Sequence, residues 1–151
     1  MRFLSALVTL IALMPGLIAY PTMASLKAKR AFVRTGPGKC YPIKWILVHP
    51  TTPLKVIESF DMWRHVEDPL GGQGWIHKSL LWSKLFVYVI QETHLRHSPK
   101  DTASPQARVE KGAFMLLKRA EGDWLYVVAE GFRGYLPQKA CWCGPLYTAL
   151  K

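Results

Sequence analysis

The sequence is poor in charged residues, and above all in acidic ones. Charged residues make up 20% of its 151 residues, and 10 Asp and Glu stand against 20 Lys and Arg. Half of the chain is hydrophobic, a proportion that suits a packed globular protein and argues against a disordered one. The basic excess favours an anionic neighbour, such as cell wall, acidic polysaccharide or phospholipid head groups, because a positive field attracts polyanions.

Long apolar runs are scarce too, and the one at the N-terminus is too short to span a bilayer. Residues 3–14 are almost purely apolar and follow the basic Arg2. A membrane-spanning helix needs about 20 apolar residues, so the pattern predicts a secretory signal peptide over residues 1–24 rather than an uncleaved anchor. Cleavage after Ala24 is favoured and cleavage after Ala19 is the alternative. The protein is therefore expected to be exported, to the periplasm or the medium.

Cysteine is limited to Cys40, Cys141 and Cys143. An odd number in an oxidising compartment allows at most one intramolecular disulfide and leaves one thiol over. A bridge from Cys40 to either Cys141 or Cys143 would tie the first half of the chain to its C-terminal end. A bridge between Cys141 and Cys143 is less favoured, because alternate residues of a strand lie near the upper limit of bonding distance.

Catalytic and metal-binding signatures are missing. Cys40 has no helix N-terminus to lower its thiol pKa and no accompanying pattern of Asp and His. His94 and His97 have no Cys or His partner at zinc spacing. The sequence thus predicts a protein that is not an enzyme and has no cofactor or metal. Nucleic acid is not expected as a partner of an exported protein.

What the sequence does contain is an internal repeat, with an offset of 60 to 63 residues. The matched positions are Val33 with Leu95, Pro42 with Pro105, Trp63 with Trp124, and Gly74-Trp75-Ile76 with Gly134-Tyr135-Leu136. So small a drift in the offset, with gaps only in polar loops, indicates duplication of one structural unit.

Each copy is predicted to consist of short strands. Residues 54–57 and 63–67 are rich in β-branched and aromatic residues, as are 113–118 and 124–129 in the second copy. Residues 84–90 form one more apolar strand, which joins the copies with almost no linker. Regular short strands separated by turns predict an all-β fold, and at this size a barrel closes its sheet edges best.

The predicted organisation is therefore two tandem small β-barrels. Barrel 1 is expected at residues 31–90 and barrel 2 at 91–143, with a basic tail at 25–30 and a C-terminal tail at 144–151. The basic tail is interpreted as a solubilising segment, or else as a weak contact with anionic membrane or polymer.

Two motifs of the first copy carry a resemblance to a known family. Residues 33–42 read Val-Arg-Thr-Gly-Pro-Gly-Lys-Cys-Tyr-Pro, and residues 74–80 read Gly-Trp-Ile-His-Lys-Ser-Leu. In this order and spacing they resemble the exported bacterial SH3-like (Src-homology-3-like, SH3b) domain family. The resemblance implies two SH3-like barrels, the second degenerate because Ser-Pro-Lys at 98–100 replaces Gly-Pro-Gly. It also implies an association with cell-wall enzymes and binding of wall peptides or protein ligands.

Aromatic residues of the first copy are the candidate ligand-binding residues. The residues predicted to contact an extended peptide are Tyr41, Pro42, Trp45 and Trp63. Tyr41 is the leading candidate, because it lies in the loop after Gly-Pro-Gly and binding residues of small domains tend to lie on loops. Trp63 and Trp75 are also expected to serve mainly as packing.

The sequence is compatible with two functions. In the first, an adaptor binds a peptidoglycan-derived or protein peptide in an open aromatic groove. In the second, a structural protein-protein interaction module buries the same rings between its barrels and binds an envelope protein without a groove ligand.

Overall fold

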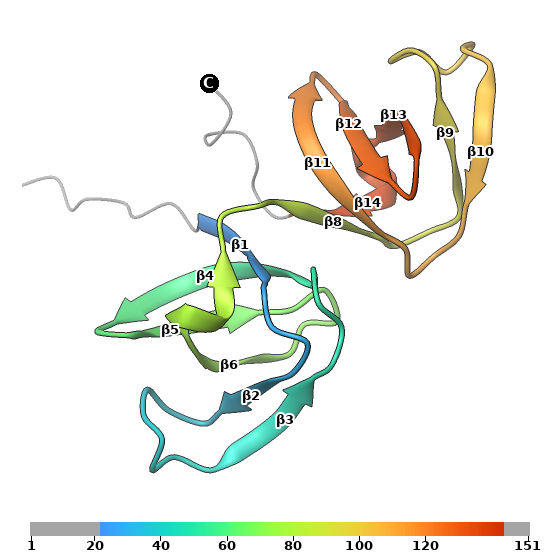
Figure 1. The fold of residues 1–151 in the computed structure, drawn as a ribbon. Coiled ribbons are helices and arrows are strands. Elements are labelled where there is room, and N and C mark those ends of the chain that lie inside the picture. The colour runs from blue at the N-terminus through green and yellow to red at the C-terminus, as the bar shows by residue number, and fades with distance from the viewer. Residues whose placement is uncertain (1–21, 144–151) are drawn as a thin grey trace, which may run out of the picture.

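The computed structural model describes residues 22–143, which form two antiparallel sheets of seven strands each (Figure 1). The first sheet contains β1 (Thr22–Leu26), β2 (Ala31–Arg34), β3 (Ile43–Leu47), β4 (Pro53–Phe60), β5 (Trp63–Glu67), β6 (Gln73–His77) and β7 (Leu81–Trp82). The second contains β8 (Phe86–Val89), β9 (Thr93–Arg96), β10 (Pro105–Val109), β11 (Phe114–Glu121), β12 (Trp124–Ala129), β13 (Phe132–Pro137) and β14 (Cys141–Trp142). A short 3₁₀ helix precedes the last strand of each sheet, η1 (Lys78–Leu80) and η2 (Gln138–Ala140).

The all-β prediction is confirmed, but the sheets are not closed into barrels. The strand orders are β3-β2-β6-β5-β4-β1-β7 and β10-β9-β13-β12-β11-β8-β14. The outermost strands of each sheet are not hydrogen-bonded to one another, so each sheet keeps two edges. A sequence pattern of short strands predicts the pairing of neighbours but not whether the outer strands meet.

The duplication is visible in the strand register. Each strand of the first sheet has its counterpart seven strands later, and the same bulge interrupts both central hairpins, between Val56 and Glu58 and between Leu117 and Arg119. One predicted match was wrong by a residue. Arg34 pairs with Ile43 and its counterpart Arg96 pairs with Pro105, so Pro105 corresponds to Ile43 and not to Pro42.

The sheets also divide the chain at a different place from the expected domain limits. β1 is paired with β4, so residues expected in a signal peptide or a basic tail belong to the first sheet. β8 is paired with β11 and β14, so the second sheet begins before residue 90. Residues 1–21, with most of the predicted signal peptide, and the predicted tail at 144–151 lie outside the described residues.

Aliphatic side chains form a separate core in each unit. Inward-facing residues alternate with half-buried ones along β5 and β6, as in Val66 and Ile76, which are 1% and 0% exposed. Trp63 and Trp75 were expected mainly as packing, but they stand half-buried on the opposite face of the same strands. The inner space is filled by smaller branched side chains, which leaves the large rings on the outside.

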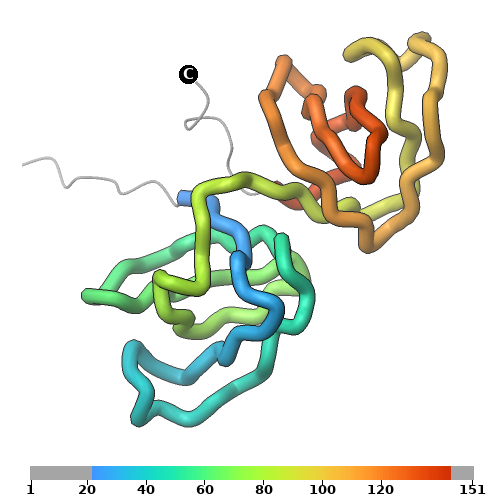
Figure 2. Tube along the Cα trace, viewed as in Figure 1, coloured from blue at the N-terminus to red at the C-terminus, as the bar shows by residue number. Residues whose placement is uncertain are grey.

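The two units meet through a small contact. The ring of Trp82 stacks on Phe86 at 6.3 Å between centroids, and His49 stacks on Phe114 at 6.1 Å. The backbone N–H of Phe86 donates a 3.2 Å hydrogen bond to the hydroxyl of Ser25. Figure 2 shows that the chain crosses once from the first unit to the second.

Within residues 22–143, no helix is long and apolar enough to cross a membrane.

Candidate ligand-binding site

The loop between β2 and β3 presents the leading candidate, Tyr41. Backbone hydrogen bonds hold the loop, from Thr35 to the carbonyl of Pro42 at 3.0 Å and from Tyr41 to the carbonyl of Gly38 at 3.3 Å. The guanidinium of Arg34 donates a 2.8 Å hydrogen bond to the carbonyl of Tyr41. The loop is therefore ordered by its own contacts before any ligand binds.

The ring of Tyr41 lies against the loop and stays accessible. A Cβ atom placed on Gly36 would lie 2.4 Å from Cδ1 of Tyr41, so the ring occupies the space that a side chain at position 36 would need. Tyr41 is 43% exposed. Figure 1 shows the β2–β3 loop at the end of the first unit that is turned away from the second, so Tyr41 is not buried between the units.

A second aromatic residue beside this loop was not anticipated. Phe32 is 40% exposed on the outer face of β2, and the guanidinium carbons of Arg30 and Arg34 lie 5.5 and 5.9 Å from its ring centroid. The sequence pattern of β2 does indicate an outward Phe32, because the small and aliphatic residues Ala31 and Val33 alternate with Phe32 and Arg34 and are buried. Together they make a surface with both aromatic and cationic character.

Trp45 lies on a different part of the first unit. It is half-buried, with ring atoms 3.2 and 3.5 Å from where a Cβ atom would stand on Gly72 and Gly74. The ammonium of Lys44 is 5.2 Å from its ring centroid and donates a 2.7 Å hydrogen bond to the carbonyl of Gln73. In residues 22–143 the buried indole N–H of Trp45 has no hydrogen-bond partner.

The four predicted residues are only partly brought together. Tyr41 and Pro42 belong to one loop, and Trp45 follows on β3. Trp63 instead packs edge-on against His77, with ring centroids 5.4 Å apart, on the outer face of β5 and β6. Three pockets in the described residues, of about 710, 460 and 330 Å³, are lined by other residues. The candidate site is thus a surface rather than a deep pocket.

The second unit repeats the loop without its aromatic residues. The guanidinium of Arg96 donates a 2.6 Å hydrogen bond to the carbonyl of Ala103, as Arg34 does to Tyr41. His97 donates to the carbonyl of Ser104 at 3.3 Å, as Thr35 does to Pro42. Position 41 therefore corresponds to Ala103.

The same comparison applies to Trp45. It pairs with Val33 on β2, and Ala107 pairs with Leu95 on β9, so Ala107 stands in the place of Trp45. Tyr41 and Trp45 are thus both replaced by alanine in the second unit.

The three cysteines are free thiols in the structure, so the predicted bridge from Cys40 is not formed. Cys40 is exposed in the β2–β3 loop, whereas Cys141 and Cys143 are 8% and 4% exposed in the core of the second unit. Burial raises the pKa of Cys141 to about 12, with a further contribution from Cys143, and burial raises the pKa of Cys143 to about 11. Both thiols therefore stay protonated and poorly nucleophilic at neutral pH.

Within residues 22–143, no group of three or more His, Cys, Asp or Glu is placed to hold a metal ion.

Comparison of the sequence with protein families identifies the class. Residues 27–83 and 91–142 each match the bacterial SH3 domain family, and together they cover more than half of the chain. The protein belongs to this family and carries two tandem copies of its domain. No curated protein matches the sequence.

Similar solved structures include NlpC2 and NlpC1 from Trichomonas vaginalis and an NlpC/P60 family protein from Bacillus cereus. NlpC2 is 12% identical with a TM-score of 0.38, over 81% of this chain and 48% of that one. NlpC1 is 13% identical with a TM-score of 0.38, over 80% and 45%. The Bacillus cereus protein is 13% identical with a TM-score of 0.37, over 80% and 56%. This chain thus spans about half the length of these proteins.

Proposed function

We propose that this protein is an exported, non-catalytic binding module of the cell envelope. Its first domain would hold a peptidoglycan-derived or protein peptide at Tyr41 and Pro42, with Phe32 and Arg34 beside them, and the peptide would extend to Trp45 on β3. Membership of the bacterial SH3 domain family supports a binding role. The buried, protonated state of Cys141 and Cys143 supports the absence of thiol catalysis at these two residues.

One observation carries the assignment to the first domain. The two loops share their backbone hydrogen bonds and their arginine clamp, yet Tyr41 and Trp45 correspond to Ala103 and Ala107. The fold of the loop therefore does not need these rings. A large ring held at 43% exposure against a glycine is suited to packing on an extended peptide.

The charge of the chain supports an envelope partner. Removal of a signal peptide that ends at Ala19 or at Ala24 would take away one basic and no acidic residue and leave 19 Lys and Arg against 10 Asp and Glu. Such a field concentrates an anionic polymer near the protein, while the aromatic surface would supply the specific contact. The alternative of a structural module without a groove ligand is less favoured, because Tyr41 is exposed and its β2–β3 loop lies at the end of the first unit away from the second (Figure 1).

A pull-down with purified peptidoglycan at moderate and high salt tests this proposal. Tyr41→Ala should lower the salt-resistant affinity about tenfold, the effect of removing a contact near the centre of a binding surface. Phe132→Ala is the matched control, since Phe132 is 54% exposed in the second domain. Binding that high salt abolishes would indicate charge attraction alone. Absence of binding would favour the structural module.

A further inference from the structure

The outer face of the central hairpin carries a row of side chains in each domain. In the second domain the row runs from Arg119 on β11 to Tyr126 on β12 and Tyr135 on β13, which are directly paired in register. In the first domain the same positions hold Glu58 on β4, His65 on β5 and Trp75 on β6.

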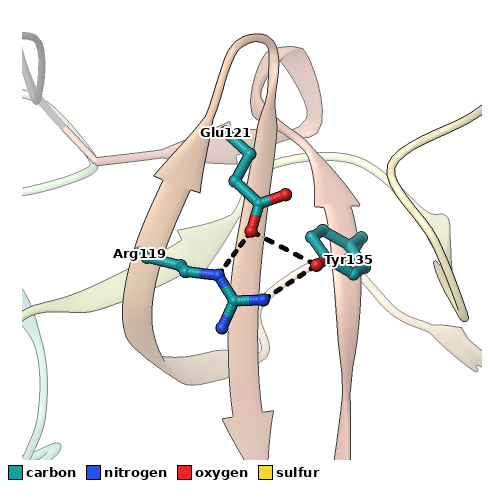
Figure 3. Close-up of polar contacts among 3 residues, drawn as sticks. All are labelled: Arg119, Glu121 and Tyr135. Atoms are coloured by element: carbon teal, nitrogen blue, oxygen red, sulfur yellow. Dashed lines mark hydrogen bonds and ion pairs between the residues drawn. The ribbon is translucent and has the colours of Figure 1, made fainter.

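The second domain shows a cation seated on this row (Figure 3). The guanidinium carbon of Arg119 lies 4.1 Å from the ring centroid of Tyr126, and Nη2 donates a 2.9 Å hydrogen bond to the hydroxyl of Tyr135. Nε of Arg119 donates to a carboxylate oxygen of Glu121, which also accepts a 3.3 Å hydrogen bond from Tyr135. Two rings and one carboxylate thus bind a cation that the chain itself supplies.

The first domain has the rings and a carboxylate but supplies no cation. His65 and Trp75 stack with centroids 5.1 Å apart and planes 19° from parallel. Glu58 stands where Arg119 stands, and Phe60 where Glu121 stands. Among residues 22–143, no Lys or Arg side chain lies over the rings of Trp63 or Trp75, and Glu58 forms no ion pair.

Acidic residues of the first domain gather at this hairpin, whereas most of its basic residues lie elsewhere. All four acidic residues between positions 22 and 83 fall within residues 58–68, on the β4–β5 hairpin and just after it. Six of the nine basic residues between positions 22 and 83 fall within residues 27–44, around β2 and β3. Lys55 and Arg64 lie on the hairpin itself, where the guanidinium of Arg64 donates hydrogen bonds to backbone carbonyls. Arg34 is the backbone neighbour of Trp75 across β2 and β6. Its guanidinium, however, donates a hydrogen bond to the carbonyl of Tyr41 and lies over the ring of Phe32, so it does not serve as the cation for Trp75.

We propose that this outer face of β4, β5 and β6 in the first domain binds the basic side chain of a peptide. The ammonium or guanidinium group would lie beside Glu58 and over His65 and Trp75, as Arg119 lies in the second domain. The aliphatic stem would cover Phe60, which is 59% exposed, and Trp63. Tryptophan is the best aromatic partner for a cation, and the carboxylate adds a charge-assisted hydrogen bond. This site is separate from the surface at Tyr41 and does not depend on it.

The test is a titration of ¹⁵N-labelled protein, residues 20–151, with the tripeptide acetyl-Gly-Lys-Gly-amide, followed by NMR. The matched probe is the same tripeptide with norleucine, which keeps the apolar stem and lacks the charge. The lysine peptide should produce saturable shifts of the Trp63 and Trp75 indole signals, and the norleucine peptide should not. Equal responses to both peptides would overturn the proposal.

Variants of exposed Glu58 locate the site without disturbing the core. Glu58→Gln should weaken binding about fivefold, the size expected for an exposed charge pair. Glu58→Arg should abolish it, because this change installs the cation that the second domain already has. Glu121→Gln and Tyr41→Ala should leave the response unchanged. Binding that survives Glu58→Arg, or that is lost in Tyr41→Ala, would show that the lysine peptide binds elsewhere.

Discussion

Gly36 and Tyr41 are packed so closely that the glycine has no room for a side chain. A Cβ atom at position 36 would lie 2.4 Å from Cδ1 and 2.5 Å from Cε1 of the Tyr41 ring. In the second domain the corresponding residues are Ser98 and Ala103, which follow the same pattern of backbone hydrogen bonds. A side chain at the first position is therefore compatible with the loop only when the ring is absent.

Gly36→Ala should consequently displace the Tyr41 ring while the loop hydrogen bonds persist. We expect it to lower salt-resistant binding to peptidoglycan about as much as Tyr41→Ala does, about tenfold. Ser98→Ala, at the equivalent position of the second domain, is the control and should bind like the wild type. Full binding by Gly36→Ala, measured in the same pull-down, would argue against the ring as a contact.

Gly74 and Gly134 lie where two strands approach closely. A Cβ atom on Gly74 would stand 2.5 Å from Cγ1 of Val33 and 2.9 Å from the carbonyl oxygen of Arg34, and one on Gly134 would stand 2.6 Å from the carbonyl oxygen of Arg96. Alanine at either position should lower the free energy of unfolding of its domain by about 1–3 kcal/mol through overpacking. Urea unfolding measures the effect, with exposed Ser59→Ala as a control. Unchanged unfolding midpoints would mean that the strands separate without strain.

The cysteines should differ sharply in reactivity. In reduced protein at pH 8, a thiol reagent such as DTNB should modify Cys40 rapidly and Cys141 and Cys143 only after unfolding, because the last two are buried. Reaction of all three thiols at one rate in native protein would contradict the buried positions. Cys40→Ser is the control that should remove the fast phase.

The same two thiols should make the second domain sensitive to alkali. Their pKa values are raised to about 12 and 11 in the folded chain, above the usual thiol value of about 8.5. Their contribution to stability is therefore complete below pH 8.5 and declines as the pH rises from there toward 11–12, because the unfolded chain ionises first. Urea midpoints at pH 8 and pH 10 test this. A Cys141→Ala, Cys143→Ala variant should show a smaller decline, and an equal decline would assign the effect to other groups.

β1 bears on the site of signal-peptide cleavage. Cleavage after Ala24 would remove Thr22, Met23 and Ala24, which pair with Val56, Lys55 and Leu54 of β4. We therefore propose that cleavage follows Ala19, so that a protein exported as proposed would begin at residue 20 and retain β1. N-terminal sequencing of the secreted protein measures this directly, and a first residue of Ser25 would contradict it. Protein that starts at residue 25 should unfold at lower urea than protein that starts at residue 20.

Much of the architecture was predictable because it depends on local patterns. The repeat, the short strands and the turns follow from alternating apolar residues and from glycine positions, and the family match confirms the two copies. The loop motif at 33–42 likewise pointed to Tyr41, which the structure leaves exposed. Cysteine pairing was not predictable, because it depends on which core receives Cys141 and Cys143.

The sequence by itself determined that the chain is an all-β duplication with an aromatic loop in its first copy, since local hydrogen bonding and side-chain alternation specify strands and turns. Only the tertiary structure decided that the sheets stay open, that β1 and β8 complete them, and that Trp63 and Trp75 stand outside the core. It also placed Arg119 on Tyr126 and left Glu58 without a cation. Those outcomes depend on which strands become neighbours, and residues on neighbouring strands are far apart in the chain.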